Sequence, residues 1–372
     1  MKSKLSDICS YRKEKIAVAE LDRGNYISTE NMLPDKNGVT TATSLPTTIH
    51  TQKYAKGDIL VSNIRPYFKK IWFADKNGGC SNDVLVFKTK EGTDPRYLYY
   101  VLANDPFFEY SMATAKGTKM PRGDKKALME YEVPDYDLKE QNKIAGVLSA
   151  IDDKIQLNNK INKNLQSQAL AIYIHMIVKK ADESWHTGLL SDIASITMGQ
   201  SPKGESYNEN GIGTVFFQGR AEFGFRFPSR RLYTTEPKRM AKINDILMSV
   251  RAPVGDLNVA YEDCCIGRGL SAIHSKDNHQ SFVLYTMFVL RQQLDVFNGE
   301  GTVFGSINRD ALNSIPISIP PHKVMDKFES IVAPMDAIIR INYEENCRLQ
   351  AMRDSLLPRL MSGELDISAL NI

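Results

Sequence analysis

Two stretches of sequence decide the fold. Residues 137–165 read DLKEQNKIAGVLSAIDDKIQLNNKINKNL, and residues 321–349 read PHKVMDKFESIVAPMDAIIRINYEENCRL. In both, apolar or asparagine side chains recur at alternating steps of four and three, the 3.5-residue spacing of a coiled-coil seam. The two seams are Ile144, Leu148, Ile151, Ile155, Asn158, Asn162 and Leu165, and Phe328, Val332, Met335, Ile339, Asn342, Asn346 and Leu349. Each stretch therefore predicts a long helix with one face suited to packing on another helix.

The ends of these helices carry their own signals. Asp137 and Glu140 make a D-x-x-E capping box, which predicts the start of the first helix. A helix of about 40 residues spans ~60 Å at ~1.5 Å per residue, which is longer than a small domain. In the second helix, Pro334 predicts a kink or a delayed start, Pro358 an end just before it, and Gly363 a stop soon afterwards.

Three packing arrangements are open for these helices. They can pair with each other, pack only on their own domains, or join two chains as an ordinary coiled-coil dimer. Two matching seams in one chain favour pairing within the chain, and the globular part between them favours an antiparallel pair. Asparagines in the middle layers would fix the register at some cost in stability.

The sequence is two copies of one plan. Residues Leu5–Ile8 (LSDI) return as Leu190–Ile193, and Gly117-Thr118 returns as Gly301-Thr302. Along the helices the offset stays at 184 residues, from Lys143/Lys327 to Leu165/Leu349. A constant frame with divergent loops is the usual way to vary a binding specificity.

Each copy begins with a mixed globular part. Short β-like runs lie between Gly, Asn and Asp turns, followed by an apolar helical pattern. The expected strands are 58–62, 70–74, 83–88, 245–250 and 258–261, and the expected helices are 96–112 and 282–297. We therefore predict an α+β protein with an internal pseudo-two-fold repeat: two mixed α/β domains separated by a long antiparallel two-helix coiled coil. The predicted boundaries are 1–136, 137–182 (helix), 183–320, 321–364 (helix) and 365–372 (tail).

Composition narrows the class of protein. The 372 residues are 42% hydrophobic, enough for two cores, and no run approaches the ~20 apolar residues that cross a bilayer. No secretory signal opens the chain, so we expect the cytoplasm. The five cysteines, an odd number without zinc-like spacing, are interpreted as reduced thiols. They are Cys9, Cys80, Cys264, Cys265 and Cys347.

Catalytic motifs are incomplete. Residues 104–107 (NDPF) approach the D/N-P-P-Y/F loop of DNA methyltransferases, but they lack the second proline and a glycine-rich turn upstream. Residues 134–139 (PDYDLK) match a nuclease signature only superficially, and a helix start explains them better. No phosphate-binding loop or HExxH is present, and no histidine has a partner at a recognisable spacing. We predict no catalytic residue and no metal ligand.

The helices and the motifs around them resemble a known family. The segments that carry the resemblance are EQNKIAGVLS (140–149), IDDKI (151–155) and LLPRLMSGEL (356–365), together with GDILVS (57–62) and NDILMS (244–249). With the doubled plan, they make the whole chain similar to the specificity (S) subunits of type I restriction-modification systems. One departure is Val324-Met325, where the second copy of the family pattern has Glu-Gln, so the second helix start is less certain.

The resemblance implies function and partners. It implies a non-catalytic subunit that reads a bipartite sequence in double-stranded DNA, one half-site per globular target-recognition domain. It also implies methylation (M) subunits, two by expectation, that form an adenine methyltransferase using S-adenosylmethionine. Restriction (R) subunits would add ATP- and Mg-dependent translocation and cleavage. Two readers on one face of a duplex should sit about one helical turn, ~34 Å, apart.

Basic residues on the divergent loops are the candidate DNA contacts, because Lys and Arg meet both phosphates and base edges. The candidates are Arg65, Lys69, Lys70, Lys116, Lys119, Arg122, Lys125, Lys126, Arg220, Arg226, Arg230, Arg231, Arg251, Arg268 and Arg309. For each, a solvated surface charge is the alternative. Thirteen of 18 arginines lie from Arg220 onward, whereas 23 of 29 lysines precede residue 187. Because Arg binds guanine edges bidentately, we expect a second half-site richer in G·C.

Two other functions stay open. The chain can be an enzyme with an unrecognised site, or a helical scaffold that binds only protein. Methylation by the chain alone would favour the enzyme. A lack of salt-dependent DNA affinity would favour the scaffold.

Overall fold

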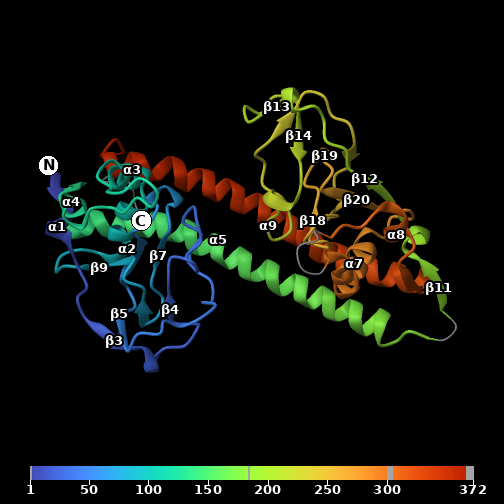
Figure 1. Cartoon of the computed structure of the whole chain (residues 1–372), viewed down its shortest axis with the longest axis horizontal. Helices are drawn as coiled ribbons and strands as arrows, with labels where there is room; N and C mark the ends of the chain where they lie inside the picture. Colours follow the sequence, from blue (N-terminus) through green and yellow to red (C-terminus); the bar gives the residue numbers. More distant parts are fainter. Residues whose placement is uncertain (1, 183–184, 300–304, 366–372) are drawn as a thin grey trace. The chain divides into compact units, whose positions relative to one another are not determined.

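The computed structural model of the chain describes residues 2–182, 185–299 and 305–365 (Figure 1). These residues form two compact units. The first unit takes residues 1–157 and the chain from 345 onward, and the second takes residues 158–344. Each unit therefore combines one globular part with a segment of both long helices. The predicted tail lies, from residue 366 on, outside the described residues.

The first unit is built on two four-stranded sheets. One has the order β2-β9-β6-β7 and is antiparallel throughout. The other has the order β3-β5-β8-β4, in which β4 and β8 are parallel. The strands are β2 (Cys9–Tyr11), β3 (Lys15–Ala17), β4 (Tyr26–Ile27), β5 (His50–Tyr54), β6 (Ile59–Ser62), β7 (Ile71–Phe73), β8 (Gly78–Cys80) and β9 (Val84–Thr89). A two-stranded pair, β1 (Lys2–Lys4) with β10 (Glu132–Pro134), closes the domain beside the long helix.

The second unit repeats most of this topology and has one more strand in its second sheet. Its sheets have the orders β12-β20-β17-β18 and β13-β15-β14-β19-β16, with β14 and β19 parallel, and β11 pairs with β21. The strands are β11 (His186–Leu189), β12 (Ala194–Met198), β13 (Tyr207–Asn208), β14 (Thr214–Phe217), β15 (Tyr233–Thr234), β16 (Met240–Ala241), β17 (Ile246–Ser249), β18 (Leu257–Val259), β19 (Cys264–Ile266), β20 (Leu270–Ser275) and β21 (Pro316–Ile319). The four-stranded sheets β2-β9-β6-β7 and β12-β20-β17-β18 correspond strand for strand, and each second sheet has a parallel pair (β4-β8 or β14-β19) beside an antiparallel strand (β5 or β16). This agreement confirms the predicted internal repeat and the α+β class.

Short helices follow the same plan in both units. The repeated LSDI segments form α1 (Leu5–Ile8) and α6 (Leu190–Ile193). In the second unit, α7 (Gln280–Leu294) covers most of the helix predicted over 282–297. The remaining short helices are α2 (Pro95–Ala103), α3 (Asp105–Ala113), α4 (Lys125–Met129) and α8 (Arg309–Asn313).

The predicted single helix over 96–112 was wrong, because it is two helices. Asn104 has extended backbone angles between α2 and α3. The cause is Pro106, which has no N–H to give and whose ring would clash with the carbonyl one turn earlier. Phe107 is fully buried, and Asp105 pairs with lysines, so the NDPF segment is a helix junction.

The long helices begin where the sequence predicts. In α5 (Leu138–Tyr173), the Asp137 N–H donates to Glu140 at 2.9 Å and the Glu140 N–H donates to Asp137 at 2.8 Å. This reciprocal pair confirms the capping box and the interpretation of PDYDLK as a helix start. A π-helical turn continues α5 over Ile174–Val178.

The helix end predicted at Pro358 was wrong for α9 (His322–Ser362), whereas the kink predicted as one alternative at Pro334 stays a prediction. Pro334 does not delay the helix and Pro358 does not end it. A proline inside a helix costs ~3 kcal/mol. Packing offsets that cost, because Leu360 and Met361, just beyond Pro358, are buried. Gly363, in the left-handed region at φ 77°, follows the last turn as predicted.

In the first unit, the start of α5 lies against the end of α9. Arg353 Nη1 donates to Asp152 Oδ1 at 2.9 Å, and Lys154 Nζ lies 3.1 Å from Glu345 Oε2. Residue numbers rise along α5 as they fall along α9, so the segments are antiparallel. Five seam residues of this unit are no more than 8% exposed: Ile144, Leu148, Ile151, Ile155 and Asn346. A sixth, Leu349, is half-buried.

In the second unit, the end of α5 lies against the start of α9, and these segments are also antiparallel. Asn342 Nδ2 donates to Asn162 Oδ1 at 2.8 Å, and the rings of Tyr173 and Phe328 are 5.5 Å apart. The seam residues here are buried or half-buried: Asn158, Asn162, Leu165, Phe328, Val332, Met335, Ile339 and Asn342. Because the seam is buried within the chain, it is not free to join two chains. Supercoiling, and the separation it would set between the units, stay predictions.

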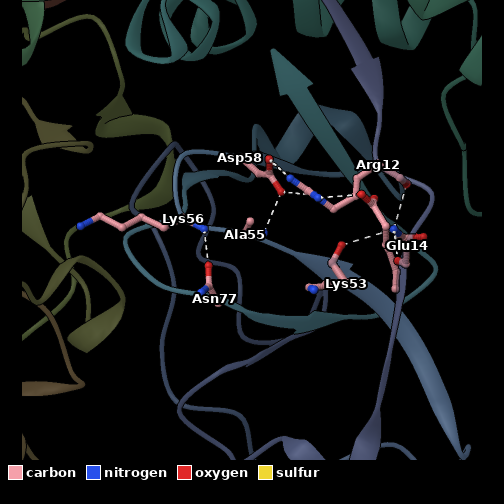
Figure 2. A network of polar contacts seen from close by, with 8 residues as sticks. Arg12, Glu14, Lys53, Ala55, Lys56, Asp58 and Asn77 are labelled. Carbon is pink, nitrogen blue, oxygen red and sulfur yellow. Dashed lines mark hydrogen bonds and ion pairs between the residues drawn. The ribbon is translucent and has the colours of Figure 1, made fainter. Parts of the chain in front are cut away.

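A buried ion pair ties the two sheets of the first unit together. Arg12 donates to both carboxylate oxygens of Asp58, from Nε at 2.5 Å and Nη2 at 3.0 Å, and the two side chains are 11% and 5% exposed (Figure 2). The Ala55 N–H donates to the same carboxylate at 2.7 Å. The hydrogen bond to Asp58 raises the pKa of Arg12. In the second copy, Asp245 keeps the backbone bond, from Lys242, but its side-chain partner is His274.

All five cysteines are free. Cys347 is exposed and the other four are buried, and burial raises the pKa of the Cys9 thiol to about 12. Among the described helices, none combines the length and hydrophobicity that crossing a membrane requires.

We predict that Asp58→Asn lowers the free energy of unfolding of the first unit by ~3 kcal/mol, because it leaves the largely buried guanidinium of Arg12 with only the exposed Glu14 as a charge partner. Urea unfolding followed by Trp72 fluorescence, in a Trp185→Phe background, measures this. Lys2→Gln removes an exposed pair, with Lys2 72% exposed, and should not move the midpoint. Equal effects of the two substitutions would contradict the role assigned to Asp58.

Candidate nucleic-acid interface

In the first unit, two loops that are far apart in sequence are joined side by side. Residues 63–70 follow β6, and residues 114–124 precede α4. Ile64 and Arg122 form an isolated β-bridge, and the Arg65 N–H donates to Pro121 O at 2.8 Å. We call these loops the first loop pair. It brings together candidates that the sequence separates by about fifty residues.

Several cations of this region project into solvent without an ion pair to any described residue. They are Arg65, Lys119, Lys125 and Lys126. Arg65 is held in the left-handed region at φ 51° by its place at the start of a 3-10 turn, Pro66–Phe68. Tyr67 and Phe68 in that turn are 49% and 38% exposed, so the basic loop also offers two aromatic rings.

Other candidates of the first unit have partners. Lys116 Nζ lies 2.5 Å from Asp124, and Arg122 lies 3.1 Å from Asp83. The Lys116 hydrogen bond, aided by backbone N–H donors, lowers the pKa of Asp124 to about 2. Lys116 and Arg122 are nevertheless exposed, so they can exchange these carboxylates for phosphates.

Lys69 and Lys70 are engaged inside the domain. Lys69 lies 2.9 Å from Asp105, and Lys70 Nζ donates to Thr29 O at 2.6 Å. Burial lowers the pKa of Lys70. Both side chains are half-buried. Their main role is therefore to position the loop, and little of their charge is exposed to a ligand.

The second unit contains the corresponding arrangement. Arg251 and Ser306 form an isolated β-bridge, and the Ala252 N–H donates to Gly305 O at 3.0 Å. We call residues 250–256 and 305–308 the second loop pair. In both units, one loop follows the corresponding strand, β6 or β17, and the other precedes a short helix, α4 or α8. Gly301-Thr302, the predicted partner of Gly117-Thr118, lies outside the described residues.

Four arginines of the second unit lie on adjoining segments. The Val250 N–H donates to Gly269 O at 2.9 Å, and the Gly269 N–H donates to Gln218 O at 3.2 Å. These bonds place the loops of Arg268 and Arg220 beside that of Arg251, and Arg309 begins α8 just after the loop pair. The adjoining exposed arginines are Arg220, Arg251, Arg268 and Arg309.

Sequence reasoning missed Asp256, which anchors this region. Its carboxylate pairs with Arg220 and accepts from Arg291 Nη2 at 2.5 Å, and its N–H donates to Ser249 Oγ at 2.9 Å. Asp256 is one of many acids in divergent loops, and no local spacing marks it. Arg251, Arg268 and Arg309 have no ion pair with any part of the chain that the structure describes.

The structure does not support Arg226 as a DNA contact. It is 5% exposed and donates to Asp336 at 3.0 Å and to Gln166 and Tyr285 at 3.2 Å. Its guanidinium therefore ties the globular part to the long helices of the second unit. A lone arginine in a divergent loop gives no sign of this burial.

Arg230 and Arg231 are exposed, but both form ion pairs with glutamates. Arg230 pairs with Glu262 at 2.5 Å, and Arg231 pairs with Glu222 at 2.5 Å and with Glu209 at 3.1 Å. The hydrogen bond to Glu222 raises the pKa of Arg231. No described backbone bond joins their segment to the second loop pair.

Comparison with known proteins assigns the chain to a family. Two copies of the type I restriction modification DNA specificity domain match it, over residues 1–167 and 182–351. The chain therefore belongs to the type I restriction modification DNA specificity family. Its relatives in that family are specificity subunits, and two specificity domains in one chain fit a bipartite DNA target.

The relatives span most of the chain. A Methanocaldococcus jannaschii protein named as the type I restriction enzyme MjaX specificity subunit is 31% identical over 309 residues, 77% of this chain and 72% of the relative. The HindI specificity subunit of Haemophilus influenzae is 21% identical over 401 residues, 83% of this chain and 87% of the relative. The crystal structure of the type I S subunit from M. genitalium has the same fold, with a TM-score of 0.58 at 18% identity over 97% of this chain and 96% of that one.

We predict that Gly123→Ala loosens the first loop pair. A Cβ atom at Gly123 would lie 2.8 Å from Ser111 Oγ and 3.0 Å from Asn63 Oδ1, so the Gly123 N–H bond to Asn63 O would be strained. The amides of Lys116 and Arg122, which bond to each other's carbonyls, should then exchange faster with deuterium. Gly204→Ala meets open space and is the control. Unchanged exchange at both amides would show that the loops do not depend on this contact.

Proposed function

We propose that each unit reads one half-site of a bipartite DNA sequence through its loop pair. The observation that carries the proposal is the recurrence of the same loop pair in both units, with exposed arginines that have no acidic partner in the described structure. The loops differ between the two copies while the strands that hold them correspond. Different loops on one frame would give two unlike half-sites.

The two loop pairs carry different chemistry. The first presents Arg65 and Arg122 with lysines and two exposed aromatic rings, whereas the second presents Arg251 beside Arg220, Arg268 and Arg309 on adjoining segments. Lysine acts as a point charge that suits phosphates, and arginine forms the planar fork that matches the guanine edge. This contrast supports a second half-site richer in G·C. A determined recognition sequence with only A·T in that half would discard it.

The spacing of the half-sites is proposed to come from the helices. In each unit, α5 and α9 are antiparallel neighbours, and both helices contribute residues to both units. A continuous pair would hold two readers at a set distance and phase on the duplex, near one turn of ~34 Å. The bases between the half-sites would then be unspecified.

Catalysis is proposed to belong to partner subunits. M subunits, two by expectation, would bind S-adenosylmethionine and methylate adenine, and R subunits would bind ATP and Mg for translocation and cleavage. The specificity-subunit relatives support this division of labour. In the second unit, α9 leaves Ile331, Ile338 and Ile341 between 40% and 58% exposed on one face, which supports docking of a protein partner there.

We predict that the two loop pairs act on separate half-sites. The target is first obtained by mapping methylated adenines in cells that express the chain with the M subunit from its own locus. Binding of the assembled complex to that duplex is then measured by fluorescence anisotropy over a range of salt concentrations. Arg65→Ala and Arg251→Ala should each weaken binding about 5- to 150-fold, as expected for the loss of ~1–3 kcal/mol per bidentate contact.

Each variant is the control for the other. On duplexes with one half-site scrambled, Arg65→Ala should lose discrimination only at one half and Arg251→Ala only at the other. If both variants weaken every duplex equally and only reduce the salt dependence, the two arginines contact phosphates alone. Loss of discrimination at the same half-site would contradict one reader per unit.

We predict that the chain alone does not methylate DNA. Purified chain with S-adenosylmethionine and target duplex should transfer no methyl group, and adding the M subunit should start transfer. Methyl incorporation is followed with labelled cofactor. Turnover by the chain alone would overturn the proposed division and favour the enzyme alternative.

A further inference from the structure

Three side chains that could hold a metal ion meet within the second unit. Asp277 and His279 lie in the loop between β20 and α7, and His322 is the first residue of α9. One ligand atom from each lies within 4.8 Å of the other two. In sequence His322 lies far from the other two, so no spacing pattern shows the set. The prediction of no metal ligand rests on spacing along the sequence, which does not reveal that these three side chains meet.

His279 is oriented as a metal ligand would be. Its side chain is 9% exposed, and Nε2 lies 2.8 Å from Asp326 Oδ1. A carboxylate accepts hydrogen bonds, so this contact places a proton on Nε2 and leaves the lone pair of the neutral ring on Nδ1. A carboxylate behind a histidine is the usual second contact of metal-bound imidazole.

The other ring nitrogen has no hydrogen bond. His279 Nδ1 is buried and finds no partner with acceptable geometry in the described structure. It faces Asp277 Oδ1 at 3.2 Å, and the second oxygen of Asp277 lies 3.6 Å from His322 Nδ1. A buried lone pair facing a carboxylate is unfavourable, and either a second ring proton that pairs with Asp277 or a metal ion between the two groups relieves it.

Two of the three spacings are close to those of ligands around one ion. Nitrogen and oxygen ligands of zinc lie ~2.0–2.2 Å from the metal, which separates two tetrahedral ligands by ~3.4 Å. The observed 3.2 Å and 3.6 Å, one to each oxygen of Asp277, lie close to that value, and the ligand atoms of all three residues lie within 4.8 Å of one another. His322 is 75% exposed, so the site opens to solvent and leaves a fourth position for water.

We propose that Asp277, His279 and His322 bind one divalent transition-metal ion, with zinc the best match to two imidazoles and one carboxylate. Asp326 is a positioning residue that holds the His279 ring. Hard cations such as Mg²⁺ prefer oxygen ligands and fit this set poorly. The bound ion would clip the first turn of α9 to the β20–α7 loop, which fixes the helix start that the departure at Val324-Met325 leaves uncertain in sequence.

The site is tested by metal binding alone, so its failure would leave the DNA-reading proposal untouched. We use the full chain without a polyhistidine tag and with Cys347→Ser, because Cys347 is the exposed thiol. Zinc is titrated in competition with a chromophoric chelator, and Co²⁺ reports the ligand geometry. We expect one ion per chain, with tetrahedral visible bands and no thiolate charge-transfer band.

Three variants and a control decide the assignment. His322 is exposed, so His322→Ala should not disturb folding. His322→Ala and Asp277→Asn should each weaken zinc binding at least 10-fold. Asp326→Asn should weaken it about 10-fold or more. His50→Ala, an exposed histidine of the first unit, should change nothing. No stoichiometric binding, or equal affinity in His322→Ala and the parent chain, would overturn the proposal.

Discussion

Neither globular core is complete without a helix from the opposite sequence repeat. In the first unit, Leu357 and Leu360 at the end of α9 pack in one cluster with Leu5, Tyr97 and other residues of the first globular part. In the second unit, residues of α5 such as Tyr173 occupy the main cluster of the second globular part. Burial of these apolar side chains contributes ~1.5–3 kcal/mol each, which holds the helices in place despite two internal prolines. The loop pairs depend on this closure, because their strands belong to the same cores.

The sequence predicts the long helices and the repeat well, but it predicts poorly where helices end or are interrupted. Seam periodicity and the Asp137–Glu140 capping box locate α5, because both are local signals repeated over many residues. Pro358 misled the prediction of the helix end, since a local cost of a few kcal/mol is outweighed by tertiary burial that sequence does not show. The opposite error, one helix over 96–112, came from giving apolar periodicity more weight than Pro106.

Candidate site residues were harder to predict, because a basic residue in a divergent loop has the same signature whether it reaches solvent or a buried carboxylate. Arg226 and Arg251 are alike in sequence, yet one is enclosed by Asp336 and Tyr285 and the other is exposed. Asp256 and the His279 cluster were missed for a related reason. Their meaning lies in partners that the chain brings from distant segments, and no alternation or spacing encodes it.

Because the end of the last helix completes the first unit, it also affects the order in which the two units fold during synthesis. The second unit is one continuous segment, residues 158–344, whereas the first needs residues from both ends of the chain. On a ribosome, the later domain can therefore finish folding before the earlier one, which must wait for the end of α9, from residue 345 on, to emerge. Until then the apolar surface that Leu357, Leu360 and Met361 will cover stays open, a state that invites chaperones or aggregation. A nascent chain stalled shortly before its end would thus carry one finished domain and one unfinished one.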